Sequence, residues 1–187
     1  MLLVLSFYVL AIRDFLFVSS PTLRSEFRLK TSESHAFVYW YHTMLIGEYT
    51  HTLDDKNRLS LPSKFRQEMG KKVFVTPGLD GCLFVFTGKE WGIISEKLSG
   101  SSMLQSDARS FNRFMFAGAE EASVDSIGRI LLPDFLKKQA TLDEKVVIIG
   151  VKDRLEIWDE KKWFDYKKGI ANRADTLAEK LGSVGIL

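Results

Sequence analysis

The sequence predicts an α+β fold, rich in β-strands, in which two similar units form a pseudo-twofold β-barrel core with peripheral helices. The main observation is an internal repeat: residues 54–62 recur as residues 125–133 with the skeleton Asp-x-x-(Asn/Gly)-Arg-apolar-x-Leu-Pro, offset by 71 positions. The similarity continues downstream, where Leu-Phe-Val-Phe at 83–86 corresponds to Leu-Glu-Ile-Trp at 155–158. Two copies are too few for a solenoid, so we expect the units to cover each other by pairing.

The repeated unit begins with a β-hairpin. Residues 49–53 alternate in polarity and are rich in β-branched and aromatic side chains, which predicts a strand, and residues 120–124 are the counterpart. Gly128 indicates a turn position with positive φ, and Asn57, the next most tolerant type, stands at the same place in the first copy. The apolar-x-Leu segments that follow each turn predict the second strands.

Helices and further strands complete each unit. Pro62 and Pro133 end the hairpins and suit the start of the short helices 62–69 and 133–140. Strands are predicted at 73–75, 83–86, 146–149 and 155–158. Thr87 opens a capping-box pattern before the helix that carries Trp91, and Asp159 caps the corresponding second helix. The expected organisation is a first unit at 44–98, a helical connection at 99–117, and a second unit with a C-terminal helix at 118–187.

Residues 1–43 differ from the rest and have no counterpart in the repeat. The apolar run at 1–12 is shorter than the roughly 20 residues that span a bilayer, and no basic segment precedes it as in a signal peptide. Three alternatives remain: a membrane anchor, a poorly ordered extension, or translation from a start codon placed too far upstream. We favour the last, with the working protein starting at Met44, and we expect no membrane partner. A natural N-terminus at Met1, found by mass spectrometry, would contradict this.

Composition limits the chemistry. The net charge of +2 is low for a nucleic-acid-binding chain, so any DNA contact must use a local patch that oligomerisation multiplies. Cys82 is the only cysteine, which excludes an intramolecular disulfide and a cysteine-based metal site. His51 is the only histidine after residue 43, and no Gly-rich phosphate loop or metal-ligand spacing is present. We therefore expect no enzyme activity, no small-molecule substrate, no cofactor and no metal.

The two Asp-x-x-x-Arg motifs, each followed by apolar-x-Leu-Pro, resemble those of the MraZ family of bacterial transcriptional regulators, over residues 44–187. Gly47-Glu48-Tyr49 and the segment 154–159 add to the resemblance. It implies an AbrB-like swapped-hairpin fold, in which two β-rich units intertwine. It also implies a cytoplasmic, nucleoid-associated homo-oligomeric ring that binds short direct repeats in double-stranded DNA, upstream of the division and cell-wall gene cluster that includes its own gene.

The resemblance implies that Arg58 and Arg129 contact DNA. Arginine suits this role because its planar fork can donate two hydrogen bonds to guanine or phosphate. The other candidate DNA-binding residues, basic and close to Arg58 in the sequence, are Lys56, Lys64 and Arg66, and the motif-supporting residues are Asp54, Asp125, Asn57 and Gly128. The first loop is favoured because it carries Lys56. Three alternatives stay open: the Asp–Arg pairs only pin the hairpins, the chain is an oligomeric protein-interaction module without DNA binding, or it is a hydrolase that uses His51 or Asp54.

Overall fold

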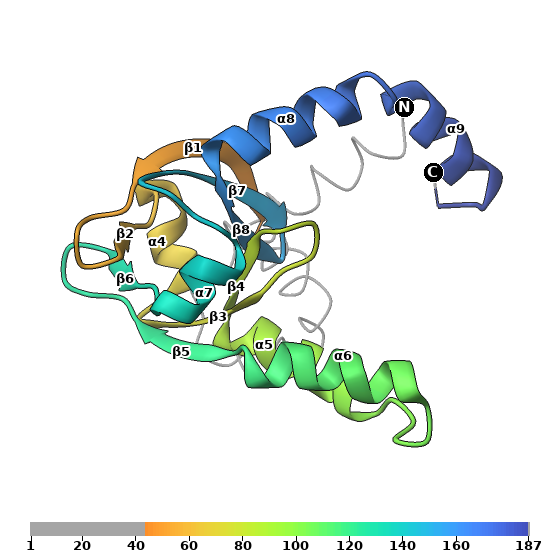
Figure 1. Ribbon diagram of the computed structural model, residues 1–187, viewed down its shortest axis with the longest axis horizontal. Coiled ribbons are helices and arrows are strands. Elements are labelled where there is room, and N and C mark those ends of the chain that lie inside the picture. The colour runs from red at the N-terminus through yellow and green to blue at the C-terminus, as the bar shows by residue number, and fades with distance from the viewer. Residues whose placement is uncertain (1–43, 187) are drawn as a thin grey trace, which may run out of the picture. The chain divides into compact units, whose positions relative to one another are not determined.

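The computed structural model describes residues 44–186, which form an α+β fold built around a large antiparallel sheet (Figure 1). The expected extension at 1–43 lies outside the described residues, so the proposed start at Met44 stays a prediction. None of the helices in the described range is long and apolar enough to span a membrane.

The main sheet has six strands in the order β1-β7-β8-β4-β3-β5, and all neighbours are antiparallel. Their bounds are β1 Leu45–Thr52, β7 Lys145–Lys152, β8 Arg154–Asp159, β4 Leu83–Thr87, β3 Lys72–Pro77 and β5 Glu120–Ser123. A second, two-stranded sheet pairs β2 (Arg58–Ser60) with β6 (Arg129–Leu131). The four strands predicted for each unit are confirmed, with β1 starting four residues earlier than expected.

The strand order shows that the two units exchange strands. β1 of the first unit pairs with β7 of the second, β5 of the second pairs with β3 of the first, and β2 pairs with β6 across the units. If each strand is replaced by its counterpart in the other unit, the same strand order results, read from the opposite edge of the sheet. A pseudo-twofold axis therefore passes between β4 and β8. The predicted pairing of the units is confirmed. The barrel is not: no closed barrel is found in residues 44–186, where β1 and β5 remain separate edges.

Six helices accompany the strands in the described range, namely α4 Ser63–Met69, α5 Gly88–Ser99, α6 Ser106–Ala117, α7 Asp134–Gln139, α8 Glu160–Ala171 and α9 Ala174–Ser183. The predicted caps are confirmed, because the Thr87 hydroxyl accepts from the Glu90 N–H and the Asp159 carboxylate accepts from the Lys162 N–H, both at 3.2 Å. Pro62 and Pro133 stand one residue before α4 and α7. The predicted helix between the units is α6.

The core supports the two short strands. Leu59 and Ile130, in the middle of β2 and β6, are almost fully buried, as are Phe65 of α4 and Leu136 of α7. Tyr49 of β1 meets Phe65 edge to face, with 5.2 Å between ring centroids. Burying each large apolar side chain contributes about 1.5–3 kcal/mol. The hairpins therefore emerge from a packed base that fixes their direction.

Candidate nucleic-acid interface

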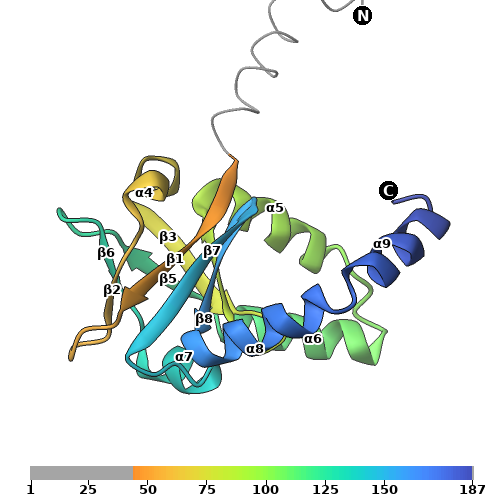
Figure 2. The same cartoon turned by 90° about the horizontal axis from the view of Figure 1, so that it is seen from above.

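The turns of the two repeats lie side by side. β2 and β6 pair with Arg58 opposite Leu131 and Ser60 opposite Arg129. Beyond the paired strands, the turn at 54–57 and the turn at 125–128 protrude at the same end of the fold in both views (Figures 1 and 2). Two reciprocal backbone hydrogen bonds of 2.9 Å join the units here, from the Leu61 N–H to the Gly128 carbonyl and from the Leu132 N–H to the Asn57 carbonyl.

Each turn is organised by its aspartate. Asp54 Oδ1 accepts from the backbone N–H groups of Lys56 (2.9 Å) and Arg58 (2.8 Å), while Oδ2 accepts from Arg58 Nε at 2.6 Å. Asp125 makes the same contacts in the second turn. Its Oδ1 accepts from the backbone N–H groups of Ile127 (3.1 Å) and Arg129 (2.8 Å), and its Oδ2 accepts from Arg129 Nε at 2.8 Å. The aspartate thus closes the turn and orients the guanidinium at once. This is the Asx-type geometry that a short carboxylate favours in turns.

The hydrogen bonds keep both carboxylates charged. The pKa of Asp54 is lowered mainly by the N–H that Arg58 donates from the backbone, and the pKa of Asp125 is lowered in the same way by Arg129. The guanidinium groups add to both shifts. Each pair therefore offsets its own charge locally, and the ion pairs that the sequence left as an alternative are present.

The two arginines are partly exposed. The exposed fraction of the side chain is 35% for Arg58 and 26% for Arg129. Arg129 Nη1 lies 3.9 Å from Asp54 Oδ2, so the second arginine also faces the first turn. Within residues 44–186, the terminal Nη groups of Arg58 make no such contact. Arg58 therefore presents the more accessible fork, and Lys56 is exposed beside it at the tip of the same turn.

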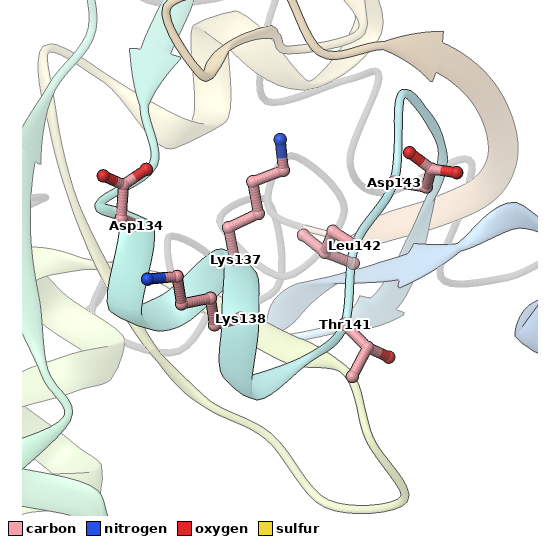
Figure 3. A pocket seen from close by; sticks show the side chains of 6 residues that line it. All are labelled: Asp134, Lys137, Lys138, Thr141, Leu142 and Asp143. Carbon is pink, nitrogen blue, oxygen red and sulfur yellow. The ribbon is translucent and has the colours of Figure 1, made fainter.

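The predicted match between Asn57 and Gly128 is confirmed by their φ angles of 55° and 84°. Asn57 adds side-chain contacts that glycine lacks: its Nδ2 donates to Asp134 Oδ1 at 2.6 Å, and its Oδ1 accepts from Lys137 Nζ at 3.1 Å. Both partners belong to α7 of the other unit. They also line a hollow of about 510 Å³ (Figure 3), together with Lys138, Thr141, Leu142 and Asp143.

Arg66 lies over the second turn. Its Nε donates to the Leu61 carbonyl at 2.8 Å, and a Cβ added to Gly128 would lie only 2.3 Å from that nitrogen. Glycine at 128 therefore leaves the room that this guanidinium occupies. Burial lowers the pKa of the half-buried His51, and the charge of Arg66 lowers it further. Arg66 is thus engaged inside the protein.

Lys64 lies apart from the turns. Its Nζ donates to the Ile46 carbonyl at 3.3 Å, near the start of β1, whereas the first turn follows the other end of that strand. The structure therefore brings together the arginines, the aspartates, Asn57, Gly128 and Lys56, but it does not bring Lys64 to them.

The two turns differ in a way that single motifs did not reveal. At the offset of 71, the positions of Lys56, Ser60 and Lys64 are taken by apolar residues, and these are exposed: Ile127 (58%), Leu131 (57%) and Phe135 (47%). Aligning the repeats beyond the shared skeleton would have found this asymmetry. The roles of Asp134 and Lys137 had no signal in the sequence, because they contact Asn57 from 77 and 80 residues away.

Residues 44–186 contain neither a group of side chains that could hold a metal ion nor a reactive cysteine. No group of three or more His, Cys, Asp or Glu side chains between residues 44 and 186 could hold a metal ion. Cys82 is buried, and burial strongly raises the pKa of its thiol, so it is a packing residue and not a nucleophile.

Comparison with known proteins agrees with the repeat. The family model described as "MraZ protein, putative antitoxin-like" matches residues 44–114 and again residues 115–181. The chain is 48% identical to the transcriptional regulator MraZ of Carboxydothermus hydrogenoformans over 138 residues, which are 74% of this chain and 96% of that protein.

Two further relatives carry the same name. The protein of Caldicellulosiruptor saccharolyticus is 48% identical and that of Clostridium acetobutylicum 44% identical, each over 143 residues that cover 76% of this chain and all of the relative. These regulators are not enzymes, in agreement with the expectation from the sequence. The double family match, the swapped sheet and the twin Asp–Arg turns together show that this chain belongs to the MraZ family.

Proposed function

We propose that the protein is a sequence-specific transcriptional regulator that binds double-stranded DNA through its paired Asp–Arg turns. The observation that carries this proposal is that two turns from distant parts of the chain protrude together, each with a partly exposed arginine held by an aspartate. The names of the relatives, all transcriptional regulators, support it.

Arg58 is the principal contact in this proposal. Asp54 holds its Nε, which leaves the two Nη groups to donate to a guanine edge or to a phosphate. Because the side chain is already oriented, less rotamer entropy is lost when DNA binds. Lys56 at the tip adds a phosphate contact, which positions the protein without reading sequence. Arg129 supports the same surface from the second turn.

Affinity from one such surface is low, because the carboxylates offset much of the positive charge. We propose that a homo-oligomeric ring presents several copies to several short direct repeats. Linked sites of this kind can gain about 10²–10⁴-fold in overall affinity without a new contact. The proposed target is the promoter of the division and cell-wall gene cluster, including the gene of this protein, in the nucleoid of the cytoplasm.

The test is the variant Arg58→Ala, compared with the wild type in gel-shift titrations on the upstream region of its gene. Loss of a two-bond contact is worth about 1–3 kcal/mol, so we expect binding to weaken about 5- to 150-fold per contact, with the melting temperature unchanged. Arg113→Ala, which removes an exposed arginine of α6, is the matched control. The contrary outcome is that Arg58→Ala lowers the melting temperature or dissociates the oligomer, while the folded variant binds DNA as tightly as the wild type. The ion pair would then only stabilise the hairpin.

A second candidate function is protein interaction without DNA binding. The observation that favours it is the group of exposed apolar side chains on the second turn, β6 and α7, namely Ile127, Leu131 and Phe135. Salt dependence separates the two candidates, because phosphate contacts release counterions and apolar contacts do not. Repeat-dependent binding that weakens steeply with salt supports the regulator, whereas absent binding supports the interaction module.

A further inference from the structure

Corresponding aromatic groups lie on the two units, outside the main core. In the first unit, Trp91 of α5 stacks on Phe74 with 5.8 Å between ring centroids and lies 6.0 Å from Phe86. Phe116 of α6 closes this group, at 5.7 Å from Trp91. The end of α6 is fixed against the sheet, because a Cβ on Gly118 would lie 2.3 Å from Pro77. In the first unit, a second helix thus covers the aromatic group.

The second unit has the aromatic group without the covering helix. Trp158 and Trp163 occupy the positions of Phe86 and Trp91, and Tyr166 joins them with 4.9 Å between its centroid and that of Trp158. Beside them lies a cavity of about 260 Å³, whose walls include Ile149, Val151, Arg154 and Glu156. Among residues 44–186, α8 is the only helix that supplies residues to the lining of this cavity, so no second helix takes the part that α6 takes beside Trp91.

The helix in the corresponding chain position is α9, and it is amphipathic with no buried residue. Leu177, Leu181 and Val184 recur at i, i+4 and i+7 on one face, and they are 38%, 40% and 67% exposed. The helix ends in a defined cap, with φ of 73° at Gly185 and the Ile186 N–H donating to the Leu181 carbonyl at 3.0 Å. Ten residues form only a marginal helix in water, so an apolar partner is expected.

In this structure α9 contributes no residue to the lining of the cavity in its own chain. α5 and α6 are joined by residues 100–105, which let α6 run back to the sheet, whereas only Asn172 and Arg173 join α8 to α9. Both views place α9 beyond the end of α8 that points away from the sheet (Figures 1 and 2). Trp163 and Tyr166 are the fourth and seventh residues of the twelve-residue α8, so α9 would have to reverse direction and run back about 8–12 Å along that helix to reach them.

We propose that α9 of one copy of this chain docks its apolar face on the Trp158–Trp163–Tyr166 cavity of a second copy, taking the place that α6 takes in the first unit. The charges agree: Asp80 lies at the rim of the cavity, and Lys180 flanks the apolar face of α9. The inference rests on the self-association proposed above, and it names the surface responsible. It does not depend on DNA binding.

The first experiment measures oligomer size without DNA, by light scattering after gel filtration. Leu181→Asp places a charge on the apolar face, and we expect the oligomer to dissociate to smaller species. Ser183→Asp places the same charge at the end of α9, outside the apolar face, and is expected to keep the wild-type size. An unchanged oligomer in Leu181→Asp would overturn the proposal, while the DNA-binding role of Arg58 would be unaffected.

The second experiment identifies the occupant of the cavity. One preparation carries Leu181→Cys and another, with a tag of different size, carries Tyr166→Cys; the two are mixed and treated with a short bismaleimide. Cys82 is buried with a raised thiol pKa, so it should not react in the folded protein. A cross-linked product containing one chain of each kind supports docking between copies. A chain that carries both Leu181→Cys and Tyr166→Cys gives the opposite readout. An intrachain cross-link in this chain, with no mixed product, would show that α9 folds back on its own chain.

Discussion

At the scale of single residues, Asp54 and Asp125 combine two tasks that are usually separate. Each carboxylate accepts two backbone N–H groups and so fixes the turn, and each holds the Nε of an arginine four residues later. A change at either aspartate therefore alters the fold of the turn and the direction of the guanidinium together. The ion-pair and DNA-contact interpretations of Arg58 are consequently compatible. The ion pair uses Nε, and the two terminal nitrogens stay available to donate to DNA.

The aspartates predict a specific loss of stability in acid. Their pKa values are lower in the folded protein than the unfolded value near about 3.9, because the charged form accepts hydrogen bonds. Their contribution is therefore complete above about pH 4 and is lost as the pH falls through the folded pKa. We expect melting temperatures between about pH 5 and pH 2 to fall less in Asp54→Asn than in the wild type.

The control for this prediction is Asp55→Asn, which neutralises the exposed neighbouring carboxylate and should reproduce the acid profile of the wild type. Superimposable profiles for Asp54→Asn and the wild type would contradict the assignment.

At the scale of elements, the two turns share a backbone shape but stabilise it differently. Gly128 tolerates positive φ without strain and leaves space for Arg66, whereas Asn57 tolerates it less freely but gains hydrogen bonds to Asp134 and Lys137. Because each turn is held by the α4 or α7 helix of the opposite unit, neither hairpin is a local structure. The side-chain network couples the candidate DNA surface to the interface between the units.

Substitutions at Asn57 separate these effects. Asn57→Val removes the hydrogen bonds and places a β-branched residue at φ 55°, so we expect a loss of about 1–3 kcal/mol from backbone strain. Asn57→Gly keeps the turn and removes only the hydrogen bonds, so its loss should be smaller, about 0.5–1.5 kcal/mol. Urea unfolding monitored by circular dichroism measures both. Equal stability of the valine and glycine variants would show that the turn carries no strain.

At the scale of the whole described fold, strand exchange makes the two units dependent on each other. The edge strand of each unit pairs with the other, and the short strands β2 and β6 pair only across the units. Buried residues of both units form one core cluster that includes Leu59 and Ile130. The two repeats therefore fold as one cooperative structure.

Splitting the chain tests this cooperativity. A fragment of residues 44–98, expressed alone, lacks the partners of β1 and β2, so we expect it to be unfolded or to form a swapped dimer with itself. Mixing it with a fragment of residues 99–187 should restore the near-ultraviolet circular dichroism of the intact chain. A folded monomer of the first fragment, shown by sedimentation and dispersed amide resonances, would be incompatible with the exchange of strands.

Much of this protein could be predicted from local chemistry in the sequence. The repeat at an offset of 71 predicted two equivalent units, the Asn57–Gly128 correspondence predicted a shared turn with positive φ, and Thr87 and Asp159 predicted two helix starts. Turns and caps depend on a few neighbouring residues, so their signals survive in a single sequence. The twin motifs also predicted the aspartate–arginine pairs, because both partners lie on one turn.

Tertiary structure alone decided which strands pair and what surrounds each turn. The open six-stranded order replaced the expected barrel, Arg66 proved to lie over Gly128, and Lys64 proved to lie near Ile46, away from the arginines. These relations join residues that are far apart in the chain or on different elements. They depend on how the apolar faces of both units pack together, which no local pattern of residues encodes.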